Sequence, residues 1–255
     1  MARRAIDGLR VVVTGGSSGI GRALVLELIR QGASVVALAR RADRLQELGA
    51  LVADEQRYRW LAGDVTRRED RAAALALAQR EFGGLDALVN NAGIGALGRF
   101  DAADEGRLRR IFEVNFFAAA EFTREALPLL RAGNKPIVVN IGSVLGHRAV
   151  PEKSEYCASK FALHGLSDAL RIELAPLGID VLLVSPSTTQ SEFFESAGAK
   201  QTRGRGMPAE TVARRTVAAM RAGRREIILS AGGNLLVWLD RLCPPLADWL
   251  IARWA

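Results

Sequence analysis

Tyr156 and Lys160 are the two residues of this sequence whose types and spacing suit acid/base chemistry. Apolar residues recur every three or four positions between Ser154 and Leu174, which predicts a helix. Side chains four positions apart stack on one face of a helix, so the lysine ammonium would lie beside the tyrosine phenol. A positive charge at that place favours the phenolate and lowers the phenol pKa.

The energy needed shows that this pair would not act alone. Lowering a phenol pKa from about 10 to about 7 takes roughly 4 kcal/mol, at about 1.36 kcal/mol per pKa unit. One lysine does not supply that much, whereas an oxidised nicotinamide would add a second positive charge. The spacing of Tyr156 and Lys160 therefore indicates one half of a hydride-transfer site whose other half lies upstream.

Composition narrows the class of protein. The chain has 255 residues, of which 49% are hydrophobic and 25% charged, an ordinary globular balance with room for a large core. The net charge is +7, but the basic residues are scattered in pairs, so no nucleic-acid-binding surface is expected. Polyanionic cofactors and anionic lipids stay open as partners.

Cysteines and the N-terminus indicate the compartment. Cys157 and Cys243 form neither a disulfide framework nor a metal-ligand spacing, so we expect no metal site and a reducing environment. The first ten residues lack the apolar run of a signal peptide. A cytoplasmic protein is the expectation, with contact to a membrane surface left open.

Apolar β-branched runs alternate with helical patterns along the chain. The candidate strands are Leu9–Val13, Ser34–Ala39, Tyr58–Ala62, Leu85–Val89, Pro136–Ile141, Ile179–Val184 and Glu226–Leu229. The candidate helices are Ile20–Gln31, Ala42–Ala53, Arg67–Phe82, Asp104–Ala132, Ser154–Leu177 and Pro208–Ala222. This alternation predicts an α/β fold, a Rossmann-like doubly wound parallel sheet of about seven strands in a single domain.

A glycine-rich stretch, Thr14-Gly-Gly-Ser-Ser-Gly-Ile-Gly21, joins the first strand to the first helix. Glycine permits a tight turn and close approach of the backbone to a pyrophosphate, and a helix N-terminus offers N–H groups and a positive dipole end. A tight strand-to-helix turn would need glycine in any case. The residues expected to bind a cofactor here are Gly15, Ser17, Ser18, Gly19, Ile20 and Gly21.

Five motifs together resemble the short-chain dehydrogenase/reductase family. They are Thr14-Gly-x-x-x-Gly-Ile-Gly21, Asn90-Asn-Ala-Gly93, Asn115, Ser143 and Tyr156-x-x-x-Lys160, in the family's order and spacing. The resemblance covers roughly residues 9–191. It implies that Asn91, Ala92 and Gly93 form the floor of the adenine and phosphate region, and that a homodimer or homotetramer forms.

The end of the second strand bears on cofactor choice. At the end of the third strand, Asp64 and Val65 resemble the family's residues near the adenine, although Asp64 also suits an N-cap of the next helix. Ala39 stands where NAD-dependent members carry aspartate, and Arg40 and Arg41 follow it. A guanidinium binds a 2′-phosphate through bidentate bonds, so NADP(H) is the expected cofactor. The alternative is that both arginines are simply solvated at a helix start.

The resemblance also implies catalytic roles. Ser143 would hold the substrate carbonyl oxygen, and Tyr156 would give its phenolic proton to that oxygen or take it back. Lys160 would lower the tyrosine pKa and bond the nicotinamide ribose. Asn115 would hold a water that connects Lys160 to solvent. Of the two histidines, His164 is expected to be a satisfied core residue and His147 is a weaker candidate for substrate contact.

One departure from the family pattern follows the sixth strand. Ser187 replaces the usual glycine after Pro186, and Thr189 and Ser191 supply the hydroxyl groups expected beside the nicotinamide. The substrate loop, residues 187–207, carries glycines and several charges, so a lid is expected there.

The C-terminal residues 233–255 are expected to form an amphipathic helical extension beyond a domain of residues 1–232. Pro244 and Pro245 break the pattern into two apolar stripes, and charged residues keep either stripe from spanning a bilayer. The first stripe contains Leu235, Trp238, Leu239 and Leu242, and the second contains Leu246, Trp249, Leu250 and Trp254. These stripes suit a membrane surface between residues 235 and 254, a partner subunit or the roof of the substrate cleft.

These observations predict an NADPH-dependent oxidoreductase that reduces a ketone or aldehyde, on a fairly apolar molecule, to an alcohol. The alternatives are an NADP-dependent alcohol dehydrogenase that uses the same residues in the oxidative direction, and a non-catalytic protein that senses NADPH or scaffolds a partner.

Overall fold

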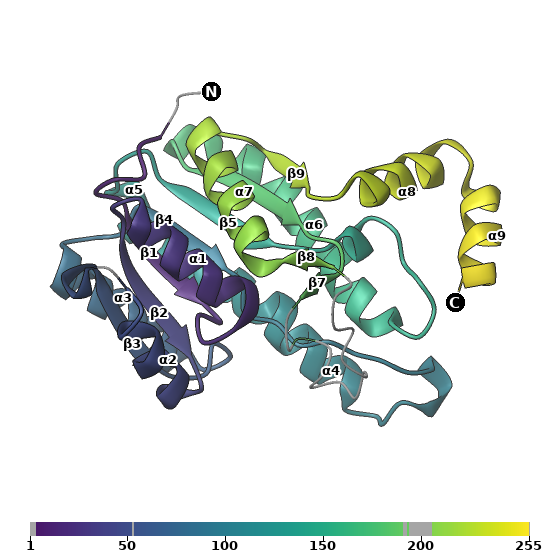
Figure 1. Ribbon diagram of the computed structural model, residues 1–255, viewed down its shortest axis with the longest axis horizontal. Coiled ribbons are helices and arrows are strands. Elements are labelled where there is room, and N and C mark those ends of the chain that lie inside the picture. The colour runs from purple at the N-terminus through teal and green to yellow at the C-terminus, as the bar shows by residue number, and fades with distance from the viewer. Residues whose placement is uncertain (1–3, 53, 191–192, 194–205, 255) are drawn as a thin grey trace.

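The computed structural model describes residues 4–52, 54–190, 193 and 206–254. Seven parallel strands form the central sheet in the order β3-β2-β1-β4-β5-β6-β9 (Figure 1). Their bounds are Arg10–Thr14 for β1, Ser34–Ala39 for β2, Tyr58–Ala62 for β3, Ala87–Asn90 for β4, Ile137–Ile141 for β5, Asp180–Ser185 for β6 and Glu226–Ile228 for β9. The predicted doubly wound sheet is confirmed.

Helices cover both faces of the sheet because its strands bury alternate side chains on opposite sides. In β1, Val11 and Val13 belong to one core cluster and Val12 to the other. The first face packs against α1 (Gly19–Arg30), α2 (Ala42–Gly49) and α7 (Ala209–Ala222). The second packs against α3 (Arg68–Phe82), α5 (Ala118–Arg131) and α6 (Ser154–Glu173).

The strand order places a crevice beside β1. The chain builds outward from β1 through β2 to β3, then returns to β4 on the other side of β1. In open parallel sheets, ligands bind at the carboxyl ends of the strands where the order reverses in this way. The glycine-rich stretch follows β1, and the motif Asn90–Gly93 begins with the last residue of β4, so both motifs meet at this point.

Three predicted helices differ from their expected bounds by more than one residue. The helix expected over 42–53 ends at Gly49. The helix expected over 104–132 begins at Arg107 and contains a π turn, Glu113–Phe117, between α4 (Arg107–Phe112) and α5. Such a turn often marks a functional site. The helix expected over 154–177 ends at Glu173, because Pro176 disfavours helical backbone at the residue before it, and a short 3₁₀ turn follows.

A small two-stranded parallel sheet was not predicted. It pairs β7 (Thr189–Gln190) with β8 (Met207–Pro208), so the two ends of the predicted substrate loop lie side by side. Most of that loop, including Ser191, lies outside the described residues.

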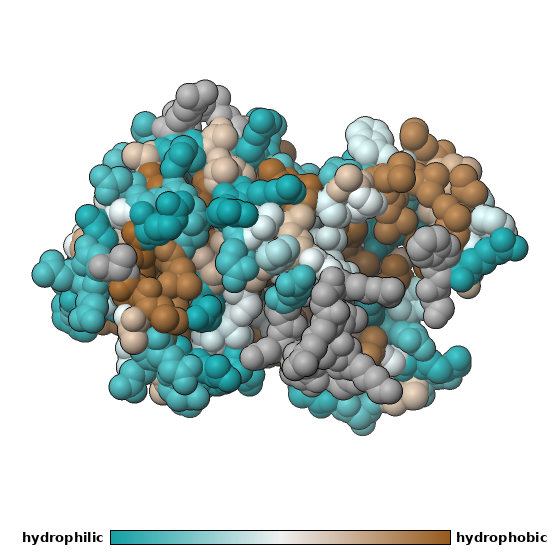
Figure 2. Space-filling view, in the orientation of Figure 1, coloured by the Kyte–Doolittle hydropathy of each residue, from teal (hydrophilic) through white to brown (hydrophobic). Residues whose placement is uncertain are grey.

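Two helices form the C-terminal extension, α8 (Ala231–Leu242) and α9 (Pro244–Trp254), and the break between them falls at the predicted prolines. Arg148 holds both helices, through ion pairs with Asp240 at 2.6 Å and with Asp248. Val237 and Ala247 are buried. The exposed large apolar side chains of the extension are Leu235, Trp238, Leu242, Leu246 and Trp249. Figure 2 shows hydrophobic surface where the extension lies. None of the described helices is both long and apolar enough to span a membrane.

Candidate active site

A cavity of about 790 Å³ opens at the carboxyl ends of the central strands. Of the predicted site residues within the described chain, all but Asn115 line it. These lining residues are Gly15, Ser17, Ser18, Gly19, Ile20, Gly21, Arg40, Arg41, Asp64, Val65, Asn91, Ala92, Gly93, Ser143, Tyr156, Lys160, Pro186 and Thr189. The fold thus brings together residues that lie far apart in the sequence.

The glycine-rich end of the cavity is held tightly against the strand-four motif. Thr14 Oγ1 accepts hydrogen bonds from the backbone N–H groups of Asn91 and Ala92, both at 2.9 Å. Gly15 has a φ of 67°, in the left-handed region, and a Cβ on Gly21 would lie 2.2 Å from the Gly15 carbonyl oxygen. Glycine is therefore required at both positions.

The start of α1 suits an anionic group. Its N-cap is Ser18, whose side chain makes no capping hydrogen bond within the described structure. The first turn, Gly19 to Arg22, carries no acidic side chain. The N–H groups and positive dipole end of α1 therefore face the cavity as a pyrophosphate would need them to.

Arg40 and Arg41 lie at the exposed rim of the same cavity, directly after β2. Asp64 is on the neighbouring loop, where its Oδ1 accepts hydrogen bonds from the backbone N–H of Thr66 at 2.9 Å and from its hydroxyl at 2.8 Å. The N-cap of α3 is Arg67, so the alternative assignment of Asp64 to that cap is wrong. Two guanidinium groups and one carboxylate thus border this end.

At the other end of the cavity, Tyr156 and Lys160 project from α6. Both are buried, with 5% and 4% of their surfaces exposed. Lys160 Nζ lies 5.9 Å from the centre of the Tyr156 ring and donates a hydrogen bond to the Ile141 carbonyl at 2.8 Å. Ser143 follows β5 and hydrogen-bonds to Tyr156. The three side chains form one buried group.

Burial dominates the electrostatics of this group. Burial raises the pKa of Tyr156 to about 12, although the hydrogen bond with Ser143 acts in the opposite direction. Burial also lowers the pKa of Lys160 to about 8. In the protein alone, desolvation of the phenolate keeps the tyrosine pKa above its ordinary value. The lowering of this pKa by Lys160 together with a bound cofactor stays a prediction. The additional positive charge expected from a cofactor is still required.

Asn115 supports the site from behind the cavity wall. Its Oδ1 accepts the Ile94 N–H at 2.8 Å, and its Nδ2 donates to the Ile94 carbonyl and to Ser159 Oγ, both at 3.0 Å. The asparagine therefore clamps the segment after Gly93 to α6. The water-holding role of Asn115 stays a prediction.

Sequence reasoning missed the apolar part of the cavity wall. Phe193 lies edge-on to Tyr156, with ring centres 5.6 Å apart. Leu236 and the first turn of α8 also line the cavity, and a Cβ on Gly233 would lie 2.7 Å from a Val144 methyl group. The start of the extension therefore roofs the cleft, which was one of the three alternatives given for this segment. Other apolar residues of the wall are Ile94, Val114, Leu145 and Val150.

His147 was a candidate for substrate contact, and that prediction is wrong. Within the described residues it does not line the cavity, and its ring is buried with Nε2 2.8 Å from Ser185 Oγ. His164 is half-buried, with Nδ1 3.2 Å from the Gly146 carbonyl oxygen.

Comparison with known proteins identifies the family. The family model described as short chain dehydrogenase matches residues 10–202. The chain belongs to the short-chain dehydrogenase/reductase family. Membership in this family supports an oxidoreductase that acts on CH–OH or C=O groups. A short-chain dehydrogenase from Streptomyces avermitilis has a solved structure that is 31% identical, with a TM-score of 0.80 over 94% of this chain and 96% of that one.

Curated relatives are similar over much of the chain. The oxidoreductase YxnA of Bacillus subtilis is 31% identical over 95% of this chain and 71% of its own length. The 11-beta-hydroxysteroid dehydrogenase A of Sesamum indicum is 31% identical over 96% of this chain and 75% of its own. The 3-ketodihydrosphingosine reductase of Bos taurus is 30% identical over 74% of this chain but only 59% of its own length. The match thus leaves part of each relative uncovered.

Proposed function

We propose that this short-chain dehydrogenase/reductase is an NADPH-dependent reductase of ketones or aldehydes. The observation that carries the proposal is the single cavity in which Ser143, Tyr156 and Lys160 lie at one end and the glycine-rich loop and Arg40 at the other. The first end suits proton transfer to a carbonyl oxygen. The second suits a phosphorylated dinucleotide.

Arg40 and Arg41 support NADP(H) rather than NAD(H). Both lie at the cavity rim, where an adenine ribose would be held if its pyrophosphate lay at the start of α1. Guanidinium groups form charge-assisted bonds with a 2′-phosphate, whereas a ribose 2′-hydroxyl is usually bound by a carboxylate after this strand. Ala39 at that place offers no such carboxylate.

The chemistry assigned to each side chain follows from its surroundings. When bound, the reduced nicotinamide supplies the hydride that adds to the carbonyl carbon. Ser143 donates a hydrogen bond to the carbonyl oxygen, and Tyr156 transfers its proton to that oxygen as the alcohol forms. Lys160, charged below a pKa of about 8, stabilises the tyrosinate that remains.

An apolar substrate suits the cavity wall. Phe193 and Leu145 pack near Tyr156, and Val150 and Leu236 also line the cavity. Apolar walls favour a ligand mostly by removing its surface from water, and a few polar groups fix its orientation. One relative is named an 11-beta-hydroxysteroid dehydrogenase and another a 3-ketodihydrosphingosine reductase.

A substrate screen tests the proposal. The loss of NADPH absorbance is followed with ketones and aldehydes of increasing alkyl length, for the wild type and for Tyr156→Phe. Turnover should increase with apolar size and should depend on the tyrosine. NADP-dependent alcohol oxidation as the faster reaction would favour the oxidative alternative. Tight NADPH binding with no turnover of any compound would favour the sensor.

The outer face of the extension is proposed as a contact surface. Trp238 and Trp249 are exposed, and the guanidinium groups of Arg241 and Arg253 lie 5.9 and 4.1 Å from the centres of their rings. A homodimer or homotetramer would cover this face, and a membrane surface reached from the cytoplasm is the alternative. Light scattering distinguishes the first and co-sedimentation with anionic vesicles the second.

A further inference from the structure

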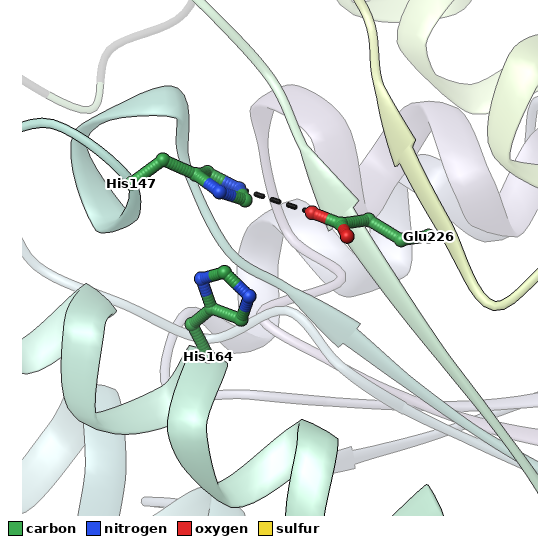
Figure 3. Close-up of side chains that lie close together, drawn as sticks. All are labelled: His147, His164 and Glu226. Carbon is green, nitrogen blue, oxygen red and sulfur yellow. Dashed lines mark ion pairs between the residues drawn. The ribbon is translucent and has the colours of Figure 1, made fainter. Parts of the chain in front are cut away.

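Three potential metal ligands meet behind the catalytic residues. His147 follows the loop that begins at Ser143, His164 lies on α6 one turn beyond Lys160, and Glu226 opens the edge strand β9 (Figure 3). One ligand atom from each of the three lies within 4.8 Å of the others. The chain contains only two histidines, and both are in this cluster.

The orientation of His164 suits a metal ligand. Its Nδ1 lies 3.2 Å from the Gly146 carbonyl oxygen, which can only accept a hydrogen bond, so Nδ1 carries the proton. Nε2 is then the nitrogen that carries the lone pair, and the Asp168 carboxylate lies 3.4 Å from it. Metal-binding histidines are commonly fixed by such a bond from the second nitrogen to a backbone carbonyl.

The ligand atoms of His147 and Glu226 are spaced as two ligands of one metal ion would be. His147 Nε2 lies 3.2 Å from Glu226 Oε1, close to the separation of about 3.3 Å between two ligands of a tetrahedral ion with bonds of about 2.0–2.1 Å. Within the described structure, Glu226 Oε1 is buried without a hydrogen-bond partner, while His147 Nε2 also has Ser185 Oγ at 2.8 Å. A buried polar atom without a partner is costly, and an ion bound to Glu226 Oε1 would satisfy it.

The cluster is also accessible to an ion. The side chain of His147 is 2% exposed, but that of Glu226 is 33% exposed and gives an ion a path from solvent. Asp168 forms an ion pair with Arg171 at 2.6 Å, and we therefore leave it out of the ligand set.

We propose that His147, His164 and Glu226 bind one divalent transition-metal ion, with Zn²⁺ the best match. Two imidazole nitrogens and one carboxylate form a donor set that zinc prefers, whereas Mg²⁺ and Ca²⁺ select oxygen ligands. The bound ion would join the segment after Ser143 to α6 and to β9. It would stabilise the wall behind the catalytic residues without entering the cofactor cavity.

The test measures metal binding directly and does not depend on turnover, so it can fail while the proposed reductase activity stands. The full chain, without a histidine tag and with Cys243→Ser to remove an exposed thiol that could bind zinc, is dialysed against Zn²⁺ and analysed for bound metal. We expect one ion per chain, and a rise in Tm on the order of 5 °C when Zn²⁺ exceeds its Kd about 100-fold. Co²⁺ in place of Zn²⁺ should give the visible absorption of a tetrahedral site.

Matched variants distinguish this site from adventitious binding. Glu226→Gln keeps the shape of the side chain and should weaken Zn²⁺ binding at least tenfold, and His164→Ala should do the same. Glu210→Gln, at an exposed position of α7, should leave it unchanged. Absence of bound zinc in the Cys243→Ser protein would overturn the proposal, as would equal binding by Glu226→Gln and Glu210→Gln.

Discussion

Replacing Lys160 by methionine should stabilise the fold at neutral pH while it abolishes turnover. The ammonium is buried, and this burial lowers its pKa from 10.5 to about 8. A shift of about 2.5 units corresponds to a cost of roughly 3 kcal/mol for holding the charge in the folded state. Methionine has a similar length and carries no charge. It loses the hydrogen bond from Nζ to the Ile141 carbonyl, worth roughly 1 kcal/mol. The variant should therefore be about 2 kcal/mol more stable at pH 7.

The stability difference should depend on pH with a defined sign. Below pH 8 the lysine is protonated in both the folded and the unfolded chain, and the cost of burying its charge is fully present. Between pH 8 and 10.5 the unfolded chain binds more protons than the folded one, so the wild type gains stability as the pH rises. Above 10.5 only the lost hydrogen bond remains. The variant should there be about 1 kcal/mol less stable.

Urea unfolding of both proteins at pH 7, 8.5 and 10, followed by far-UV circular dichroism, measures this difference. Taking the difference between the two proteins removes the contributions of Tyr156 and Cys157, whose pKa values are also raised by burial. A Lys160→Met protein that is less stable than the wild type at pH 7 would refute the reasoning. A difference in unfolding free energy that stays constant with pH would also refute it, because the folded protein would then not lower the pKa of the lysine.

Three further predictions concern binding. Arg40→Asp should weaken NADPH binding by roughly 100-fold and change NADH binding only a few-fold, because it removes charge-assisted bonds worth about 1.5–3 kcal/mol each. A fluorescence titration in which the wild type binds both cofactors equally would contradict the NADP(H) assignment. Gly21→Ala should abolish nucleotide binding, because its Cβ would lie 2.2 Å from a carbonyl oxygen of the same loop, and calorimetry showing unchanged binding would contradict this. A chain ending at Ser230 should bind NADPH normally but show a raised KM for carbonyl substrates, because Leu236 no longer roofs the cleft. An unchanged KM would mean that the extension takes no part in substrate binding.

The fold could be predicted from the sequence because its signals are local. Buried parallel strands read as continuous apolar runs, and the glycines after β1 are required by backbone geometry that nearly any dinucleotide loop shares. The π turn at Asn115 could not be predicted, since one extra residue per turn hardly changes the apolar periodicity.

The sequence motifs predicted which residues form the site, but they did not predict the burial and the long-range contacts of those residues. The raised pKa of Tyr156 depends on burial by residues from several elements, among them Phe193, which no sequence motif marks. The roof formed by α8 and the cluster of His147 with Glu226 join segments far apart in the chain. Such contacts are set by strand order and by the packing of the extension, neither of which a local pattern specifies.

Transfer of deuterium from NADPH labelled at the transferable position tests the central claim most directly. The wild type and Tyr156→Phe are each incubated with the labelled cofactor and the best carbonyl compound of the screen, and the product is analysed by mass spectrometry. We predict one deuterium on the alcohol carbon for the wild type, and a rate lower by about 10²–10⁴-fold for a Tyr156→Phe protein that still binds NADPH. Product without deuterium, or transfer by the variant at the wild-type rate, would contradict hydride transfer with Tyr156 as the proton donor.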